Sequence, residues 1–246
     1  MFQTNKLIED VADLYFLILR GFGNPAANRI MIHLVMNRSY NIQLVGATGV
    51  GKSSFGQRVL TNTVRRRYRE GHLEAGSIAF SSPIGRVTFN IRECACSIFT
   101  PNLEQQVRDE WANTDAFFVM TSRKERLVLL ESEKWIKAIR NVRGNDVQIV
   151  LVDPRIDMPG IHNFLPTIRS ICGRYGNRDP VTNLVSDIPY VEVSSIIGTN
   201  IHGPFLALQG ILRTYLRNFC PNNISNIPIT PLLQPNQLPP PAPPPA

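Results

Sequence analysis

The sequence predicts an α/β fold with a mostly parallel sheet, and three observations support this. Short apolar runs that are typical of buried strands recur along the chain. Helical stretches, such as 131–142 and 205–217, lie between several of these runs. The chain has 246 residues, 43% of them hydrophobic and 18% charged, which suffices for one sizeable core but not for two full domains. Alternating strands and helices then favour a parallel sheet flanked by helices.

The chain begins with a segment, 1–38, that we predict to be a helical extension. Leu7, Val11, Leu14 and Ile18 recur at helical spacing, and glycines and a proline then end the pattern. We expect this helix to pack on the domain, and binding of a partner is the alternative. We assign 39–220, which follows this extension, to the main domain.

The chain ends in a proline-rich tail, 221–246. This tail has no charged residue and holds 10 of the chain's 19 prolines. Proline cannot continue a helix, so we predict a disordered or polyproline II tail. Docking to a proline-binding domain is the alternative to an inert tail.

Cysteine use and the first residues bear on the cellular compartment. Cys94 and Cys96 lack the two-residue gap that metal sites and redox pairs usually have, so we expect reduced thiols. The start carries acidic residues ahead of its apolar run, unlike a secretory signal, and 14–19 is too short to span a bilayer. We therefore expect a protein of the nucleus and cytoplasm that does not enter a membrane.

Within the main domain the expected strands follow one another at regular intervals. They lie at 41–46, 85–91, 115–121, 147–153 and 189–195. In a parallel sheet of this kind the loops that bind a ligand gather at the carboxyl ends of the strands.

The loop after the first strand carries the clearest motif, "GATGVGKS". It matches G-x-x-x-x-G-K-[ST] through Gly46, Gly51, Lys52 and Ser53, with a strand before it and a helix after it. Glycines let successive backbone N–H groups point at phosphate oxygens, the lysine adds a positive charge, and the serine hydroxyl can bind Mg²⁺. The loop predicts a nucleoside triphosphate or diphosphate with Mg²⁺.

Further along, the sequence resembles the Ran branch of Ras-like small GTPases. The segments that carry the resemblance keep the family's order: "GKSSFGQRVLTNTVRRRY", "VTFNIRECA", "FFVMTSR", Trp135, "VQIVLVDPRID" and "VSSIIGTNIHGPFLAL". They cover about residues 41–217. The resemblance implies a Ras-like P-loop NTPase fold with a six-stranded, mostly parallel sheet flanked by helices, and GTP or GDP with Mg²⁺ as cofactors.

The second switch departs from the family's Asp-Thr-Ala-Gly-Gln. Glu93 keeps a carboxylate that can serve the metal, although its extra methylene shifts the charge. Cys96 replaces the glycine whose N–H approaches the γ-phosphate. Ser97 stands at the position of the glutamine that orients the attacking water and is too short for that role. We expect weak or lost intrinsic hydrolysis.

The base-binding motif, Asn-Lys-x-Asp in the family, is Pro154-Arg155-Ile156-Asp157 in this chain. Asp157 keeps the carboxylate that can accept hydrogen bonds from guanine N1–H and its amino group. Pro154 lacks the family's amide, and Arg155 can lie along the ring. An ordinary loop aspartate is the alternative for Asp157.

The last loop and the first switch complete the expected site. The family's Ser-Ala-Lys is Ser194-Ser195-Ile196, and 172–183 resembles an added loop. For the first-switch metal ligand Ser77 is the candidate, and Thr63 a poorer one. The expected nucleotide-binding residues are Gly46, Ala47, Thr48, Gly49, Val50, Gly51, Lys52, Ser53, Ser54, Arg155, Asp157, Ser194 and Ser195, and the expected metal ligands are Ser53, Glu93 and Ser77.

The charge of the chain and the resemblance both bear on its partners. The net charge of +7 suits phosphate ligands and nucleic acid equally well. The basic segment 65–70 lies where the Ran branch is also basic, so we expect a solvated face there rather than a nucleic-acid site. The resemblance implies importin-type transport receptors, an exchange factor and an activating protein as partners.

Together these features predict a Ran-like, guanine-nucleotide-dependent switch in nucleocytoplasmic transport. A pseudo-GTPase that binds proteins, with a structural nucleotide or none, is the main alternative. An ATP-binding P-loop protein is a third, favoured by Pro154 and opposed by Asp157.

Overall fold

The computed structural model describes residues 39–63, 75–82, 85–145, 147–157, 163–178, 184–208 and 210. The expected helical extension, the basic segment and the proline-rich tail lie outside these residues. The elements are β1 Ser39–Gly46, α3 Lys52–Thr61, β2 Gly76–Ser82, β3 Gly85–Glu93, α4 Leu103–Ala112, β4 Ala116–Met120, α5 Arg126–Arg143, β5 Gln148–Asp153, α6 Leu165–Tyr175, β6 Asn177–Arg178, β7 Val185–Ser186 and β8 Tyr190–Glu192, followed by helical turns at 203–208.

The protein has an α/β fold around a six-stranded, mostly parallel sheet. Its strand order is β2-β3-β1-β4-β5-β8, and the edge strand β2 is antiparallel to β3 while the other pairs are parallel. Strands β6 and β7 form a separate two-stranded sheet. None of the helices that the structure describes is long and apolar enough to cross a bilayer.

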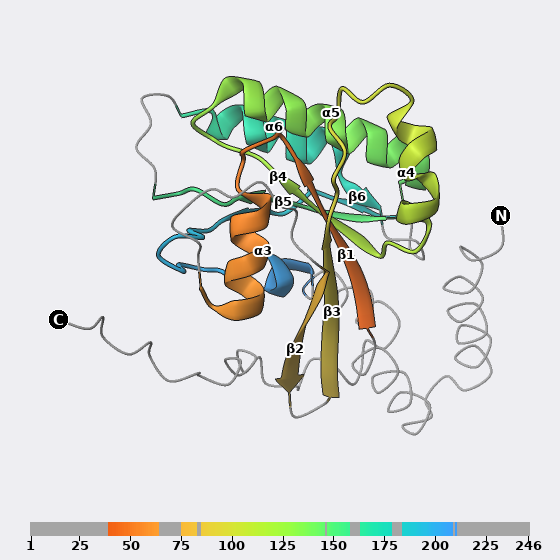
Figure 1. Cartoon of the computed structure of the whole chain (residues 1–246). Helices are drawn as coiled ribbons and strands as arrows, with labels where there is room; N and C mark the ends of the chain where they lie inside the picture. The colour runs from red at the N-terminus through yellow and green to blue at the C-terminus, as the bar shows by residue number, and fades with distance from the viewer. Residues whose placement is uncertain are drawn as a thin grey trace.

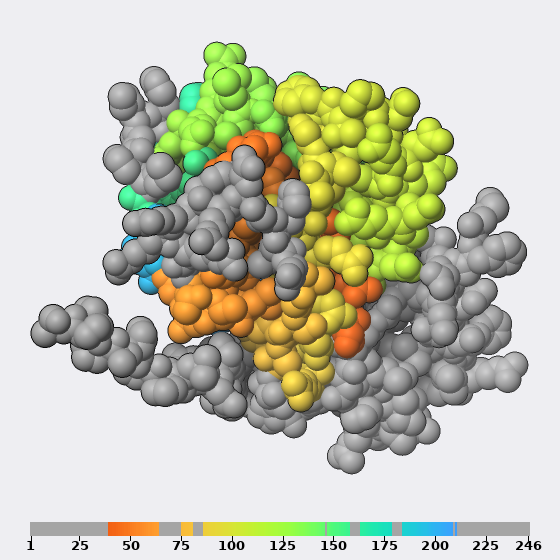
Figure 2. Space-filling model, in the orientation of Figure 1, coloured from red at the N-terminus to blue at the C-terminus, as the bar shows by residue number. Residues whose placement is uncertain are grey.

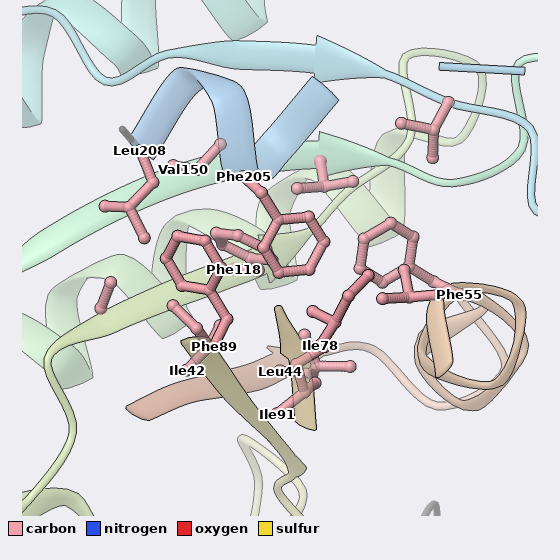
Figure 3. Packing of buried hydrophobic residues seen from close by; sticks show 14 of the residues in the cluster. Ile42, Leu44, Phe55, Ile78, Phe89, Ile91, Phe118, Val150, Phe205 and Leu208 are labelled. Atoms are coloured by element: carbon pink, nitrogen blue, oxygen red, sulfur yellow. The ribbon is translucent and has the colours of Figure 1, made fainter. Parts of the chain in front are cut away.

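Helices cover both faces of the sheet. Helices α4, α5 and α6 lie on one face, and α3 lies on the other with the turns at 203–208 (Figure 1). The buried residues form two clusters, one for each face. On the α3 face Phe205 is central: its ring centroid lies 5.1 Å from that of Phe118 and 5.2 Å from that of Phe89 (Figure 3). The short helical turns are thus anchored by one large ring.

All five strands expected from the apolar runs are confirmed as β1, β3, β4, β5 and β8. The helix expected after "GATGVG" is α3, and the helix expected at 131–142 lies within α5. The helix expected at 205–217 is described only at 203–208 and 210.

Two elements differ from the expectation. Strand β2 was missed within the first-switch region, although Ile78 and Phe80 alternate toward the core. The expected added loop, 172–183, begins inside α6, because Ile168, Ile171 and Cys172 bury one helical face despite the glycines nearby. Residues 177–178 then pair with β7, and 179–183 lie outside the described residues.

Candidate functional site

The loop expected to bind phosphates, 46–53, is called the phosphate loop below. It joins the carboxyl end of β1 to α3. Gly46, Gly49 and Gly51 have φ angles of 144°, 74° and 113°, a region that favours glycine. A Cβ on Gly46 would lie 2.7 Å from the carbonyl oxygen of Met120, and one on Gly51 would lie 3.1 Å from Cγ of Pro154. The loop therefore sits directly against the ends of β4 and β5. Of the other expected loop residues, Ala47 and Val50 are buried, Ser54 is half-buried and Thr48 is exposed.

Lys52 is held inside this loop. Its Nζ donates hydrogen bonds to the carbonyl oxygens of Gly46 (2.9 Å) and Ala47 (3.0 Å), and the residue is only 8% exposed. Burial lowers the pKa of Lys52, while the nearby Glu93 carboxylate opposes that change. An ammonium has three N–H donors. The two bonds to the loop thus leave a donor for an anion bound there.

The side chains of Ser53, in the first turn of α3, and Glu93, the last residue of β3, are in contact. The parallel pairing of β1 and β3 places Glu93 opposite Leu44, beside the start of the phosphate loop. The Ser53 hydroxyl donates a hydrogen bond of 2.8 Å to Oε2 of Glu93. Hydroxyl and carboxylate oxygens suit Mg²⁺, and oxygens bound to one Mg²⁺ at about 2.1 Å stand about 3 Å apart. The donor set and its spacing therefore fit this ion.

The segment after β3 holds the expected second switch. It lies at the surface next to α5, as the yellow and green areas of Figure 2 show. Cys94 is buried, its N–H donates to the Leu44 carbonyl (2.9 Å), and burial raises its thiol pKa to about 12. Cys96 is half-buried, and Cys94, Cys96 and Cys172 are free thiols. The first thiol is therefore protonated at neutral pH.

Ser97 is engaged in a turn of its own. Its N–H donates to Oγ1 of Thr100 (3.1 Å), and its Oγ accepts a hydrogen bond from the N–H of Phe99 (3.3 Å). The side chain is short and exposed, and its oxygen serves local backbone geometry. The side chain is also shorter than the glutamine that the family has at this position.

The residues expected to bind the base, called the base side below, are the turn 154–157 and the last loop, 194–196. The turn follows Asp153, the last residue of β5. This carboxylate is 1% exposed and accepts hydrogen bonds from the backbone N–H groups of Arg123 (2.9 Å) and Arg155 (3.2 Å). Burial raises the pKa of Asp153, and the two N–H groups partly offset this. Asp153 therefore ties the turn after β5 to the segment after β4.

Arg155 and Asp157 occupy that turn. Arg155 forms an ion pair with Glu125 and a backbone bridge with Ser194, and its Nε is buried without a hydrogen-bond partner among the described residues. Asp157 is exposed at the end of the turn, next to 158–162, which lie outside the described residues. The structure thus brings Arg155 to the last loop and leaves Asp157 exposed to solvent.

The last loop packs against the same turn. Ser194 and Ser195 are both buried; Ser195 N–H donates to the Pro154 carbonyl (3.1 Å), and Ser194 Oγ accepts from Ile197 N–H (3.1 Å). The side-chain oxygen of Ser195 is buried and has no partner among the described residues. Pro154, Arg155 and the two serines therefore form one connected unit.

A cavity of about 840 Å³ lies beside this unit. Arg123, Tyr190 and Glu192 line it together with Ile156 and Asn200. Arg123 forms an ion pair of 2.7 Å with Glu192, and the Tyr190 hydroxyl donates to Oε1 of Glu192 (3.1 Å). Burial raises the pKa of Tyr190, so that it remains a neutral donor.

The two candidates for the first-switch ligand lie apart from Ser53 and Glu93. Ser77 lies in β2 opposite Asn90, to which its hydroxyl donates (2.7 Å), and Asn90 lies three residues before Glu93 on β3. Three residues of strand span about 10 Å. Thr63 is exposed just after α3, and the segment that follows it, 64–74, lies outside the described residues.

Sequence reasoning missed three residues that hold the site together, Arg58, Glu125 and Asp153. Arg58 lies 137 residues from Ser195, whose carbonyl it contacts, and Glu125 lies 30 residues from Arg155. No motif links residues at such separations, and only the strand before the base turn could have pointed to Asp153. A scan against models of protein families and a search of curated proteins both found no match to this chain, so its function is inferred from the site itself.

Proposed function

We propose that this protein binds a guanine nucleotide with Mg²⁺ and belongs to the Ran-like branch of small GTPases, as a switch in nucleocytoplasmic transport. The observation that carries the proposal is the contact between Ser53 and Glu93, 2.8 Å apart beside the buried ammonium of Lys52. These groups come from separate elements, and together they provide what a phosphate chain and its metal require.

The fold is compatible with the P-loop NTPase fold that the resemblance implies. The sheet is six-stranded and mostly parallel, with helices on both faces, and the phosphate loop lies at the carboxyl ends of its strands. We propose the Ras-like version of that fold. Ligands of open α/β sheets bind at this edge, which supports the placement of the nucleotide.

On the phosphate side, backbone N–H groups of residues 47–53 and the Lys52 ammonium would hold the phosphates. Ser53 and Glu93 would hold Mg²⁺, which supplies positive charge to the phosphate oxygens when bound. The loop is preformed at its two ends, because Gly46 packs against Met120 and Gly51 against Pro154. Little ordering of the loop is then needed on binding.

On the base side, Asp157 would accept hydrogen bonds from guanine N1–H and its amino group, which adenine does not offer. Arg155 would lie along the ring, held in place by Glu125. The buried serines of the last loop keep its backbone close to this position. We expect selectivity for guanine at a lower affinity than the family motif provides.

Hydrolysis in this proposal is weak or lost. Ser97 has a short side chain, which does not reach as far as the glutamine that orients water in the family. Binding and release of the nucleotide would then set the affinity for importin-type receptors, with an exchange factor and an activating protein as further partners.

Ser97 and Pro154 also support a second function. A cyclic side chain that packs against Gly51 and a Ser97 side chain engaged in the turn suit a protein-binding module that keeps nucleotide as a structural ligand or binds none. In that case nucleotide exchange would not alter partner binding.

Titration of the purified chain with fluorescent GTP, GDP and ATP analogues, with and without Mg²⁺, tests the proposal. We expect Mg²⁺-dependent binding of both guanine nucleotides and weaker binding of ATP. Binding of no nucleotide would reject the proposal in favour of the protein-binding module, and equal affinity for ATP and GTP would reject the role of Asp157. A single-turnover assay then measures hydrolysis.

A further inference from the structure

One guanidinium connects the helix of the phosphate loop to the last loop. Arg58 lies in α3, six residues after Lys52. Its Nε donates a hydrogen bond of 2.8 Å to the carbonyl oxygen of Ser195, and one terminal nitrogen donates to the carbonyl of Ile196. The other terminal nitrogen donates to the carbonyl of Asn62 (2.9 Å), at the end of α3 itself. The side chain therefore bonds to three carbonyl groups in two segments.

The last loop is shaped to accept this side chain. Gly198 has a φ of 82°, and a Cβ at this position would lie 3.6 Å from Cζ of Arg58. A glycine here thus lets the loop backbone turn over the guanidinium without strain. On the opposite side the loop is held by Ser195 N–H, which donates to the Pro154 carbonyl (3.1 Å). The loop is therefore fixed between α3 and the base turn.

The geometry requires an arginine. A guanidinium is planar and offers five N–H donors in a fixed fork, so that one side chain can serve three carbonyls in different directions. A lysine ammonium is a compact group with three donors and cannot span the same carbonyls. Three hydrogen bonds from a charged donor are a strong restraint on two consecutive loop residues.

We propose that Arg58 is a positioning residue for the base: it fixes the backbone of Ser195 and Ile196 and so sets affinity for the guanine ring without acting on the phosphates. The inference rests on the proposed function. Arg58 lies on the helix that begins at the phosphate loop, but these three hydrogen bonds go to the last loop and to the end of α3, and none of the three goes to residues 46–53. Its loss should therefore separate base binding from phosphate binding.

The test compares Arg58→Gln with Arg58→Lys in the full chain. The control Arg108→Gln removes the same charge from an exposed site on α4. Each protein is titrated with fluorescent GTP and with inorganic tripolyphosphate as competitor, in the presence of Mg²⁺. We expect Arg58→Gln to weaken GTP binding about tenfold and tripolyphosphate binding less than twofold. Arg58→Lys should fall between Arg58→Gln and the wild type, and the control should match the wild type.

Two results would overturn the inference. An equal loss of affinity for GTP and tripolyphosphate would mean that Arg58 supports the whole site, and no loss for either would mean that the contacts do not matter. Thermal unfolding of each variant shows whether it is folded. If Arg58→Gln does not fold, the comparison is made between Arg58→Lys and the wild type.

Hydrogen exchange separates this inference from the proposed function. The amides of Ser195, Ile197 and Gly198 are hydrogen-bonded within the described part of the chain. We expect them to exchange at least tenfold faster in Arg58→Gln than in the wild type, with amides of β4 unchanged. If the wild type binds no nucleotide, the proposed function fails together with the base role. Faster loop exchange would then retain Arg58 as the residue that positions the loop, and unchanged exchange would overturn that too.

Discussion

The phosphate side and the base side of the candidate site are built in different ways. The phosphate side comes from one continuous segment, 46–53, and a single residue of the neighbouring strand, Glu93. The base side combines three segments, around Arg123, Arg155 and Ser195, which are held together by hydrogen bonds between backbone groups and by the Asp153 side chain. A site encoded in one segment can be predicted from spacing, whereas one assembled from several depends on the whole fold.

The two sides also differ in how well their polar groups are paired. Lys52, the buried cation of the phosphate side, donates to two carbonyls. On the base side, Arg155 Nε and Ser195 Oγ are buried without a partner among the described residues. Buried polar atoms without partners cost free energy, which a ligand that pairs with them can recover. The base side therefore keeps buried polar atoms with which a ligand can still pair.

The largest expected effect is on the free energy of unfolding, at the phenylalanine cluster next to the last loop. Phe205 follows the last loop and packs among four phenylalanine rings, those of Phe55, Phe80, Phe89 and Phe118. Phe205→Ala should lower the free energy of unfolding by about 3–5 kcal/mol, because it leaves a cavity in the centre of that cluster. Urea denaturation measures this. Leu206→Ala, at an exposed neighbour, should cost less than about 1 kcal/mol, and equal costs would contradict the central role of Phe205.

A pair of glycines tests the packing of the phosphate side. In Gly46→Ala the new Cβ would meet the backbone oxygen of Met120 at 2.7 Å, which cannot move freely. Gly49 also has a positive φ, but nothing lies within 4 Å of the position that its Cβ would take. We expect Gly46→Ala to lower the free energy of unfolding by about 3 kcal/mol and Gly49→Ala by about 1 kcal/mol. Similar values in chemical denaturation would show that φ alone, and not the contact with β4, limits the loop.

Lys52→Met tests the charge on the phosphate side. The change removes the ammonium that would contact the phosphates, so affinity for both GTP and tripolyphosphate should fall about a hundredfold. Competition titrations measure both ligands. The control Lys134→Met lies on the exposed face of α5 and should leave both affinities unchanged. A loss limited to GTP would contradict the phosphate role.

The sequence predicted the phosphate side because its chemistry lies in one motif. The loop and the helix after it follow from the motif, and the five strands β1, β3, β4, β5 and β8 follow from apolar runs. The resemblance placed Glu93 at the second switch, and the structure brings it to Ser53 across 40 residues. Strand β2 was missed because its start resembled a switch segment, although Ile78 and Phe80 are buried. The apolar signal was present, but the expected function of the segment obscured it.

Most of the base side could not be predicted in this way. Arg58 and Ser195 are 137 residues apart and meet only because α3 and the loop after β8 lie at the same edge of the sheet. Spacing says nothing of such contacts, since they depend on strand order and on backbone carbonyls that every residue has. Ser77 is a residue whose type suggested a role that the register does not support: its hydroxyl suits a metal, but it lies opposite Asn90, three residues before Glu93.

Asp157→Asn tests the proposed contact between Asp157 and the guanine ring. An amide cannot accept two hydrogen bonds from guanine as a carboxylate does, so GTP affinity should fall about tenfold while tripolyphosphate affinity stays within twofold. Affinity for ATP should also be unchanged, so that the ratio between GTP and ATP falls. Asp109→Asn, on the exposed face of α4, is the control for charge. Unchanged GTP affinity would make Asp157 an ordinary loop aspartate.

The smallest expected effect concerns His202, a half-buried histidine that follows the last loop. His202 packs its ring edge-on to Phe80, with centroids 5.5 Å apart, and its Nδ1 has no hydrogen-bond partner among the described residues. Burial lowers the pKa of His202 below its ordinary value of 6.5. As the pH falls through 6.5 the unfolded chain therefore binds a proton that the folded chain resists, so the free energy of unfolding decreases until the pH passes below the folded pKa. Urea denaturation between pH 7.5 and 5 should show this decrease in the wild type and a smaller one in His202→Gln. Identical slopes would mean that His202 binds a proton as readily in the folded chain as in the unfolded chain, which would contradict an effect of burial on its pKa.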